Sequence, residues 1–540
     1  MRFGLIAICS VLPVAACAAA TDPRPTDESP HSDRGGIGVV AQAETASPVP
    51  LDVRRSFAVT DAAITTRFSL AAVLGQLAPT GQSAADLFRQ LWDTQNPAPG
   101  LAGVTGPHCS DAEGTLNGFP QPCRAGEGAQ ASPTSPVTMA SYAAVGLFNR
   151  FDLAPASGAN CGEHRIVFAK TDASAGRAFV IFEATLPNPR LDKGLEGCRP
   201  VVDFWAGLSS DASVASRADK LVSFYFRGLP GFAPVVAADN YGKNGGQVRL
   251  NMFITPTWLL RETKLTTSCA GAACRVTFEP VTVKTNPAPT LFSASSSDPR
   301  AVDFRAFFPT QVASLARPNV MTFDYAVPDR FNAGGSLPDS TDSYTRAFAG
   351  NTALRTAISN ELTRIGSPLT PEDIVGRAQA LSCGGCHQTS SGANVGGGLT
   401  FPSSGFFVHA SETSENGPDG PRFQISPALT GTFLPFRASV LASFLTRDTD
   451  GDGVPNARDN CLAAANASQV DTDGDGFGNA CDADLNNDGF VNALDLALFK
   501  AAFGTRGGAA DLNGDGIVNA LDLGLFKPLF GAPPGPSATR

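Results

Sequence analysis

The C-terminal part of this 540-residue chain carries a charge pattern that cannot fold without counterions. From Asp448 to the end there are 14 aspartates, no glutamate and only 5 lysines or arginines, whereas the preceding residues are almost neutral. The aspartates alternate with glycines, as in DTDGDG, and the last stretch is a near-duplicate: DLNNDGFVNALDLALFK, then DLNGDGIVNALDLGLFK. Carboxylates packed this densely repel one another, and glycines permit tight reversals around an ion. We therefore expect a series of cation-binding loops here.

The first half of this region, residues 448–483, resembles a pair of thrombospondin type 3 repeats. The similarity covers DTDGDGVPNARDNC and NASQVDTDGDGFGNACD, including Asn466, Gln469 and the closing cysteines 461 and 481. Oxygen atoms at loop positions 1, 3, 5 and 12, with a backbone carbonyl at 7, suit a cation of the size of calcium. The predicted ligands are Asp448, Asp450, Asp452, Val454 (carbonyl) and Asp459, then Asp471, Asp473, Asp475, Phe477 (carbonyl) and Asp482.

The duplicated second half, residues 484–531, resembles the paired repeats of a dockerin, each a calcium loop followed by one helix. In each copy, ALDLxLFK places leucine and phenylalanine on one helix face, so the two copies can pack together. The resemblance implies calcium ligands at Asp484, Asn486, Asp488, Asn492 and Asp495, then at Asp511, Asn513, Asp515, Asn519 and Asp522.

The dockerin resemblance implies a cohesin-like partner, typically within a polysaccharide-degrading assembly. The residues before each twelfth loop position are Ala493-Leu494 and Ala520-Leu521, where the best-known cellulosomal dockerins have hydroxyl residues. Two interpretations therefore stay open: a docking module, or a calcium-stiffened spacer without a partner.

The N-terminus has the layout of a bacterial export signal, with Arg2, an apolar run over residues 3–14 and then small residues. Two outcomes are open: cleavage near Ala18 or Ala20, or lipidation of Cys17 at a lipobox-like sequence. No other run reaches the ~18 apolar residues of a spanning helix, so a lipid anchor would be the only membrane attachment. We expect an exported protein that is periplasmic, tethered to the outer membrane or extracellular.

Export places the chain in a compartment where disulfides form. Proximity in the sequence predicts four disulfides among eight cysteines, although eight cysteines allow about 105 pairings. The predicted pairs are Cys109–Cys123, Cys161–Cys198, Cys269–Cys274 and Cys461–Cys481. In this assignment Cys383 and Cys386, which are close together in the sequence, are not part of any of the four pairs.

The sequence Cys383-Gly-Gly-Cys386-His387 resembles the haem-attachment motif of c-type cytochromes. Two thiols three residues apart can reach both vinyl groups of one porphyrin, and the next histidine becomes the proximal iron ligand. A capped helix starting at Thr370 would deliver the motif, and a helix over 435–445 would close the segment. A Cys383–Cys386 disulfide, a thioredoxin-like redox pair and a zinc site are the alternatives.

The sequence does not fix the second axial ligand of such a haem. We predict His409 because it is the only histidine downstream and no methionine follows the motif. An open sixth position, or a ligand from the preceding region such as Met321, are the alternatives. Ligation by two histidines gives a lower reduction potential than histidine and methionine.

Residues 51–369 read as a β-rich α+β region that matches no family we can name. The stretches HRIVFAK and RAFVIFEATL predict a hairpin, SAADLFRQLWDTQ an amphipathic helix, and two further helices precede the cysteine motif. No metalloprotease, serine-hydrolase or phosphate-loop motif occurs. An acid/base pair of carboxylates needs a defined distance in space, which one sequence does not give for candidates such as Asp152, Glu163, Glu183 and Asp203. Enzymatic activity therefore stays an open question. The sequence has no stripe of basic and aromatic residues, so nucleic acid is not a predicted partner.

Together these features predict a multidomain chain. The segments are an export signal (1–20), a flexible linker (21–50), the α+β region (51–369), a small α-helical cytochrome c-like segment (370–447), thrombospondin-type loops (448–483), a two-helix dockerin-like module (484–531) and a tail (532–540). The leading hypothesis is an exported calcium-binding protein with a covalent haem c that transfers electrons to a redox partner. The alternatives are a dockerin-bearing component of a polysaccharide-degrading assembly that acts on or binds carbohydrate, or a calcium-stiffened adhesion protein.

Overall fold

The computed structural model describes residues 50–94, 115–120, 125–171, 176–242, 245–253, 258–338, 343–405 and 407–539. The predicted export signal, nearly all of the predicted linker and the predicted Cys109–Cys123 pair lie outside these ranges. Within the described part of the chain, no helix combines the length and apolarity needed to cross a bilayer.

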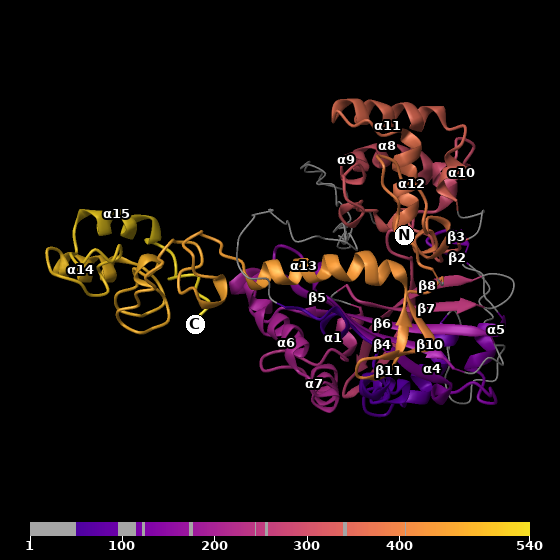
Figure 1. Cartoon of the computed structure of the whole chain (residues 1–540), viewed down its shortest axis with the longest axis horizontal. Coiled ribbons are helices and arrows are strands. Elements are labelled where there is room, and N and C mark those ends of the chain that lie inside the picture. The colour runs from indigo at the N-terminus through magenta and orange to yellow at the C-terminus, as the bar shows by residue number, and fades with distance from the viewer. Residues whose placement is uncertain are drawn as a thin grey trace, which may run out of the picture.

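An antiparallel sheet of seven strands forms the centre of the body (Figure 1). Its order is β1 (Ala58–Val59), β4 (Tyr142–Arg150), β5 (Asn160–Lys170), β6 (Arg177–Pro187), β7 (Gln247–Phe253), β8 (Leu259–Ala270) and β9 (Ala273–Val281). The predicted hairpin is confirmed as β5 and β6, with Ile166 opposite Phe182. Most residues of these two strands are buried whichever way they point, so both faces of the sheet centre are covered.

Short helices from the first half of the chain cover the sheet. They are α1 (Val53–Ser56), α2 (Ala62–Thr65), α3 (Leu70–Leu77), α4 (Ala84–Trp92), α5 (Ala125–Gly128), α6 (Arg199–Ser210) and α7 (Val214–Arg227). The predicted amphipathic helix is confirmed as α4, which starts at a capping box between Ser83 and Asp86. The predicted Cys161–Cys198 disulfide joins β5 to the segment before α6, and the Cys269–Cys274 disulfide joins β8 to β9.

A second, helical layer follows the sheet in the sequence and has its own apolar cluster around Phe292, Phe304 and Phe331. It contains α8 (Arg300–Phe307), α9 (Val312–Leu315), α10 (Tyr344–Phe348), α11 (Thr352–Arg364) and α12 (Pro371–Leu381). We predicted one helix over 301–316, but a 3-10 turn at Phe308–Gln311 divides it. Pro309 explains the break because proline removes a helical hydrogen bond and clashes with the preceding turn.

Residues 370–447 do not have a separate core among the described residues. The segment comprises α12, a π-turn at Gly385–Thr389, the hairpin of β10 (Ala410–Gly417) and β11 (Gly420–Ile425), and α13 (Leu434–Leu445). We predicted that the closing helix would pack on the helix before the motif. Instead, Ile374, Val375 and Ala378 of α12 belong to the helical cluster, whereas Leu441 and Phe444 of α13 belong to the sheet cluster. Each of these two helices can bury more apolar area against a layer of the body than against the other short helix.

The tail leaves the body at the end of α13 (Figure 1). Its loops precede α14 (Ala493–Ala502) and α15 (Ala520–Leu529), the two predicted helices, whose Phe499 and Phe526 meet in a small core. Between the loops, Cys461 and Cys481 form the predicted disulfide. The Asn456 side chain donates a hydrogen bond to Glu196 of the body, with a nitrogen–oxygen distance of 2.9 Å.

Candidate functional site

A cavity of about 820 Å³ lies between the sheet, the end of α12 and α13. All four residues that we predicted for haem binding line it: Cys383, Cys386, His387 and His409. Met321, the alternative ligand, lines it as well. Neither Cys383 nor Cys386 is part of a disulfide. Residues from Met321 to His409 therefore meet at one site.

The turn that carries the motif requires glycine at its centre. A Cβ atom on Gly385 would lie 1.7 Å from the carbonyl oxygen of Gln379, and one on Gly384 would lie 2.5 Å from that of Leu337. The Ser382 hydroxyl accepts a hydrogen bond from the Gly385 amide, which bends the chain as α12 ends. Neighbouring backbone atoms therefore leave room only for glycine at the two positions between the cysteines, and any side chain there would displace the turn.

His387 has one ring nitrogen anchored and the other available. Its Nδ1 lies 2.5 Å from the Phe407 carbonyl oxygen, which can only accept, so Nδ1 carries the proton and Nε2 keeps its lone pair. Burial lowers the pKa of His387 to about 4, and the charge of Arg249 acts in the same direction. The imidazole is therefore neutral at pH 7, which is the state that binds a metal ion.

His409, directly before β10, is held in a similar way. Its Nδ1 lies 2.8 Å from the Ser426 hydroxyl, and its Nε2 lies 3.4 Å from the Cys386 sulfur. The rings of His387 and His409 have centroids 4.8 Å apart. Two imidazoles are thus side by side, each with Nδ1 held by a partner from elsewhere in the chain.

The carboxylates that we named as catalytic candidates are engaged in ion pairs. Asp152 contacts Arg150 at 2.9 Å, and Glu183 contacts both Arg165 at 2.9 Å and Arg249 at 3.3 Å. Burial acts to raise the pKa of Asp152, but neighbouring arginine charges outweigh it and hold that pKa below its ordinary value. Asp152 therefore stays ionised and is a poor general acid at neutral pH.

The other two candidates have comparable roles. Glu163 pairs with Arg165 at 2.5 Å, and Asp203 lies on α6 next to Arg199, away from the cavity lining. Sequence reasoning missed the groups that orient the histidines, Phe407 and Ser426. A backbone carbonyl and a lone serine leave no motif, so only the fold reveals them.

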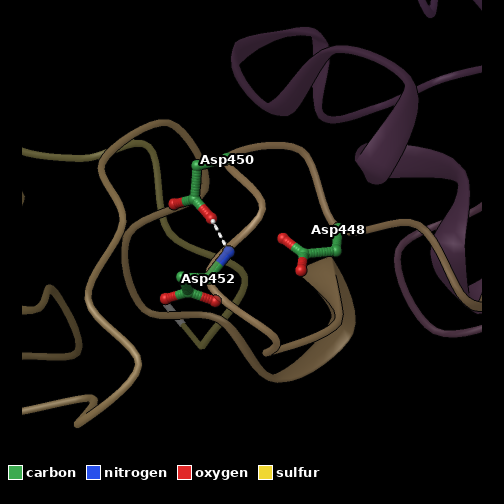
Figure 2. A group of neighbouring side chains, drawn as sticks. All are labelled: Asp448, Asp450 and Asp452. Atoms are coloured by element: carbon green, nitrogen blue, oxygen red, sulfur yellow. Dashed lines mark hydrogen bonds between the residues drawn. The ribbon is translucent and has the colours of Figure 1, made fainter.

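The first thrombospondin-like loop brings its acidic side chains together. Figure 2 shows Asp448, Asp450 and Asp452 gathered in one loop, with ligand oxygens within 4.8 Å of one another. Asp448 accepts hydrogen bonds from the amides of Gly451 and Gly453, which close the loop around it. Burial, followed by the charge of Asp459, raises the pKa of Asp450. The predicted ligands thus form an unbalanced negative cluster, which is a suitable environment for a divalent cation.

The second loop repeats this arrangement with Asp471, Asp473 and Asp475. Its twelfth-position residue, Asp482, has its pKa raised to about 7, first by burial and then by the charges of Asp475 and Asp473. Carboxyl groups that resist ionisation without a cation become good ligands when one binds, because the cation removes the repulsion.

The two dockerin-like loops have the same local geometry as each other. Asp495 is fully buried and accepts hydrogen bonds from the amides of Asn486 and Asn492; Asp522 does the same in the other copy. Each twelfth-position carboxylate therefore closes its loop and also caps the following helix. Asparagines replace some acids, so each loop carries less charge than the thrombospondin-like loops do.

Comparison with known families identifies two modules in this tail. The thrombospondin type 3 repeat model matches residues 446–469, and the dockerin type I domain model matches residues 483–528. No curated protein and no solved structure matches the chain. The matches support a calcium-binding, dockerin-bearing protein of extracellular type. They lie outside the cavity and give no support to haem.

We predict that calcium stabilises the tail and that Asp473→Ala removes one site. Asp473 makes few contacts within the protein, so its loss should change the calcium-free state little. At calcium concentrations 100-fold above the dissociation constant, one lost site corresponds to about 2.7 kcal/mol of stabilisation. Calorimetric unfolding with calcium and with chelator measures this difference, and Asp192→Ala, an exposed ion-paired aspartate of the body, is the control. An unfolding transition of the tail at the same temperature with calcium and with chelator would contradict the prediction.

Proposed function

We propose that this chain is an exported, dockerin-bearing protein whose body holds one covalently attached haem and transfers electrons. The single observation that carries the haem part is that Cys383, Cys386, His387 and His409 line one cavity. The docking part follows from the family match of the C-terminal repeats. The two parts are compatible because the residues they use are separate.

The cavity passes three tests of fit for a c-type haem. Its volume of about 820 Å³ lies within the ~300–1,000 Å³ of cofactor sites. Its two cysteines are outside any disulfide and have the spacing that thioether formation requires. The Nε2 lone pair of His387 remains available for iron because the Phe407 carbonyl fixes the tautomer. Bound there, haem would supply a one-electron iron couple.

Each protein group has a distinct part in this proposal. Cys383 and Cys386 would hold the porphyrin, and His387 would supply a nitrogen ligand to the iron. Trp258 packs against His387 with ring centroids 5.6 Å apart and helps to exclude water from the proximal side. His409 would supply a second nitrogen ligand. A second protein ligand would limit the access of small molecules to iron, which favours electron transfer over oxygen chemistry.

We predict that the haem survives acid-acetone extraction. The Soret absorbance and one covalent porphyrin mass should persist in protein from a host that matures haem c, whereas Cys383→Ala/Cys386→Ala should lose both on extraction. The matched control is Cys269→Ala/Cys274→Ala, which removes a pair of cysteines from β8 and β9. A colourless wild-type protein, or a Cys383–Cys386 disulfide found by mass spectrometry, would refute the haem proposal.

We predict that His409, rather than Met321, is the sixth ligand. His409→Ala should convert the spectrum of the bound haem from low spin to high spin and let carbon monoxide bind the reduced protein. Met321→Ala should leave both properties unchanged. The opposite pattern would assign the distal position to Met321. If the sixth position has no protein ligand, neither variant should change the spectrum or carbon monoxide binding.

The second candidate function is attachment to a cohesin-like partner, and an exposed apolar surface favours it. Leu494 is 62% and Leu521 is 65% exposed, and each lies directly before the twelfth position of its calcium loop. Further exposed apolar side chains are also duplicated between the repeats: Phe490 with Ile517, Leu498 with Leu525, and Phe503 with Phe530. A large exposed apolar surface of this kind indicates a protein-binding site. The assembly would be one that degrades polysaccharide.

We predict calcium-dependent capture by a cohesin, reduced at least tenfold in Leu494→Ser/Leu521→Ser because burying a leucine contributes about 1.5–3 kcal/mol. A cohesin panel on a biosensor, with calcium or with chelator, measures the effect. Leu191→Ser is the matched control, since Leu191 is 64% exposed on the body. Absence of capture by every cohesin would leave the spacer or adhesion role.

A further inference from the structure

One wall of the cavity is the base of the β10–β11 hairpin, and the same base carries His409 and its partner. Val408, His409 and Ala410 line the cavity. The Ser426 amide donates to the His409 carbonyl oxygen at 2.9 Å, and the Ser426 hydroxyl lies 2.8 Å from Nδ1 of the His409 ring. His409 and Ser426 therefore bracket the hairpin, so a displacement of the hairpin carries His409 with it.

Apolar packing fixes other walls of the cavity more firmly than it fixes this hairpin. α13 buries Leu434, Leu441 and Phe444, and the strands at the centre of the sheet are buried on both faces. In β10, by contrast, every residue after Ser411 is exposed or half-buried, and Ile425 is the one buried residue of β11. Burial of apolar surface therefore holds the hairpin less strongly than it holds α13 or the central strands.

Charge pairs fasten the hairpin to the body instead. Each of its three acidic side chains contacts an arginine from an earlier part of the chain. The pairs are Glu412 with Arg177 of β6, Glu415 with Arg54 of α1, and Asp419 with Arg55 of α1 and Arg217 of α7. The backbone adds one contact on the other strand, where the Phe423 amide donates to the Thr60 carbonyl oxygen at 2.9 Å.

The pair at the tip of the hairpin is the most buried of these contacts. The Arg217 side chain is fully buried, and its distance to Asp419 is 2.8 Å. A buried guanidinium group is unfavourable without a carboxylate beside it, so Asp419 is strongly held at this position. In Figure 1 the hairpin lies over the sheet, and β10 contacts β4 and β5 while β11 contacts α2.

We infer that this hairpin, residues 410–425, is a strap whose ion pairs hold His409 at the cavity and which opens to admit the ligand of the cavity. Glu412 and Asp419 are then positioning residues for His409: Glu412 lies three residues after it, and Asp419 holds the tip. The inference deepens the proposed function and rests on it for the nature of the ligand, a planar porphyrin ring. The opening of the strap itself can be measured without haem.

The two histidines show why a wall of the cavity has to move. The rings of His387 and His409 have centroids 4.8 Å apart, so a planar ligand between them requires one histidine to be displaced. His387 is held by two contacts, because Trp258 packs against its ring and the Phe407 carbonyl oxygen holds its Nδ1. His409 is carried by the strap, which depends on charge pairs that are partly open to solvent. Opening of the strap therefore separates the two rings.

The first test measures the strap by hydrogen exchange and mass spectrometry in haem-free full-length protein with calcium. Glu412→Gln/Asp419→Asn should raise the exchange rate of amides 410–425 about tenfold, the factor expected for the loss of partly exposed ion pairs. Amides of β5 and α13 should exchange as in wild type. The matched control is Asp203→Asn/Glu361→Gln, which removes two ion-paired carboxylates from α6 and α11.

Reversal of one pair separates the charge interaction from a general loss of structure. Arg177→Glu places two acidic side chains next to each other and should also accelerate exchange in the strap. Arg177→Glu/Glu412→Arg restores opposite charges and should return the exchange rate to that of wild type. These two variants keep the test decisive should the neutral double variant fail to fold.

The second test measures entry of the ligand. Iron protoporphyrin IX is mixed with full-length Cys383→Ala/Cys386→Ala protein in a stopped-flow instrument, and the Soret absorbance is followed. Adding Glu412→Gln/Asp419→Asn should accelerate association about tenfold and lower the low-spin fraction of the bound haem, since His409 is less well positioned. Salt at about 1 M should accelerate association only where the ion pairs are intact, because it screens partly exposed charges.

The outcomes distinguish the strap from the haem proposal. Unchanged exchange of amides 410–425 in both the neutral variant and Arg177→Glu would overturn the strap, whether or not the protein binds haem. Faster exchange with an unchanged association rate would overturn the role of the strap in ligand entry. Faster exchange in a protein that binds no haem would support the strap and refute the haem proposal alone.

Discussion

The turn that follows α12 depends on contacts from both layers of the body. Its Gly384 amide donates to the Ser336 hydroxyl, and the Ser336 amide and carbonyl in turn pair with Leu260 of the sheet. On the other side, the Ser404 hydroxyl donates to the His387 carbonyl. The cysteine motif is thus held between sheet and helices rather than within a small domain of its own. This explains why the cavity can be large: its walls come from elements that have cores elsewhere.

Charge is handled in opposite ways in the two parts of the chain. The body pairs its buried charges, and Asp152, Glu163, Glu183 and Glu262 each contact an arginine. The tail leaves its aspartates next to one another, with hydrogen bonds mainly from loop amides. Burial of unpaired carboxylates is unfavourable, and divalent cations are the natural remedy. The same electrostatic rule therefore indicates calcium for the tail.

The sequence allowed prediction of several features that depend on local spacing. Three disulfides, the capping box at Thr370, the β5–β6 hairpin and the helices after the two dockerin-like loops appear as predicted. The packing of α13 was predicted wrongly, because an amphipathic helix does not reveal which apolar surface it covers. The anchors at Phe407 and Ser426, and the arginines from three separate strands, depend on contacts across more than 15 residues. No periodicity or motif encodes such contacts.

One helix links the proposed functions. α13 supplies Arg437 and Val440 to the cavity wall, and the first calcium loop begins at Asp448, just after this helix ends. Asn456, within that loop, reaches back to Glu196 of the body, and the Ala538 amide near the C-terminus donates to the carbonyl of Asp459. The chain end thereby returns to the first loop and ties the dockerin-like module to it. Calcium bound in this loop would therefore also fix the direction in which the proposed docking surface points relative to the cavity. A partner bound at Leu494 and Leu521 would hold the cavity at a defined position, which is what electron transfer within an assembly requires.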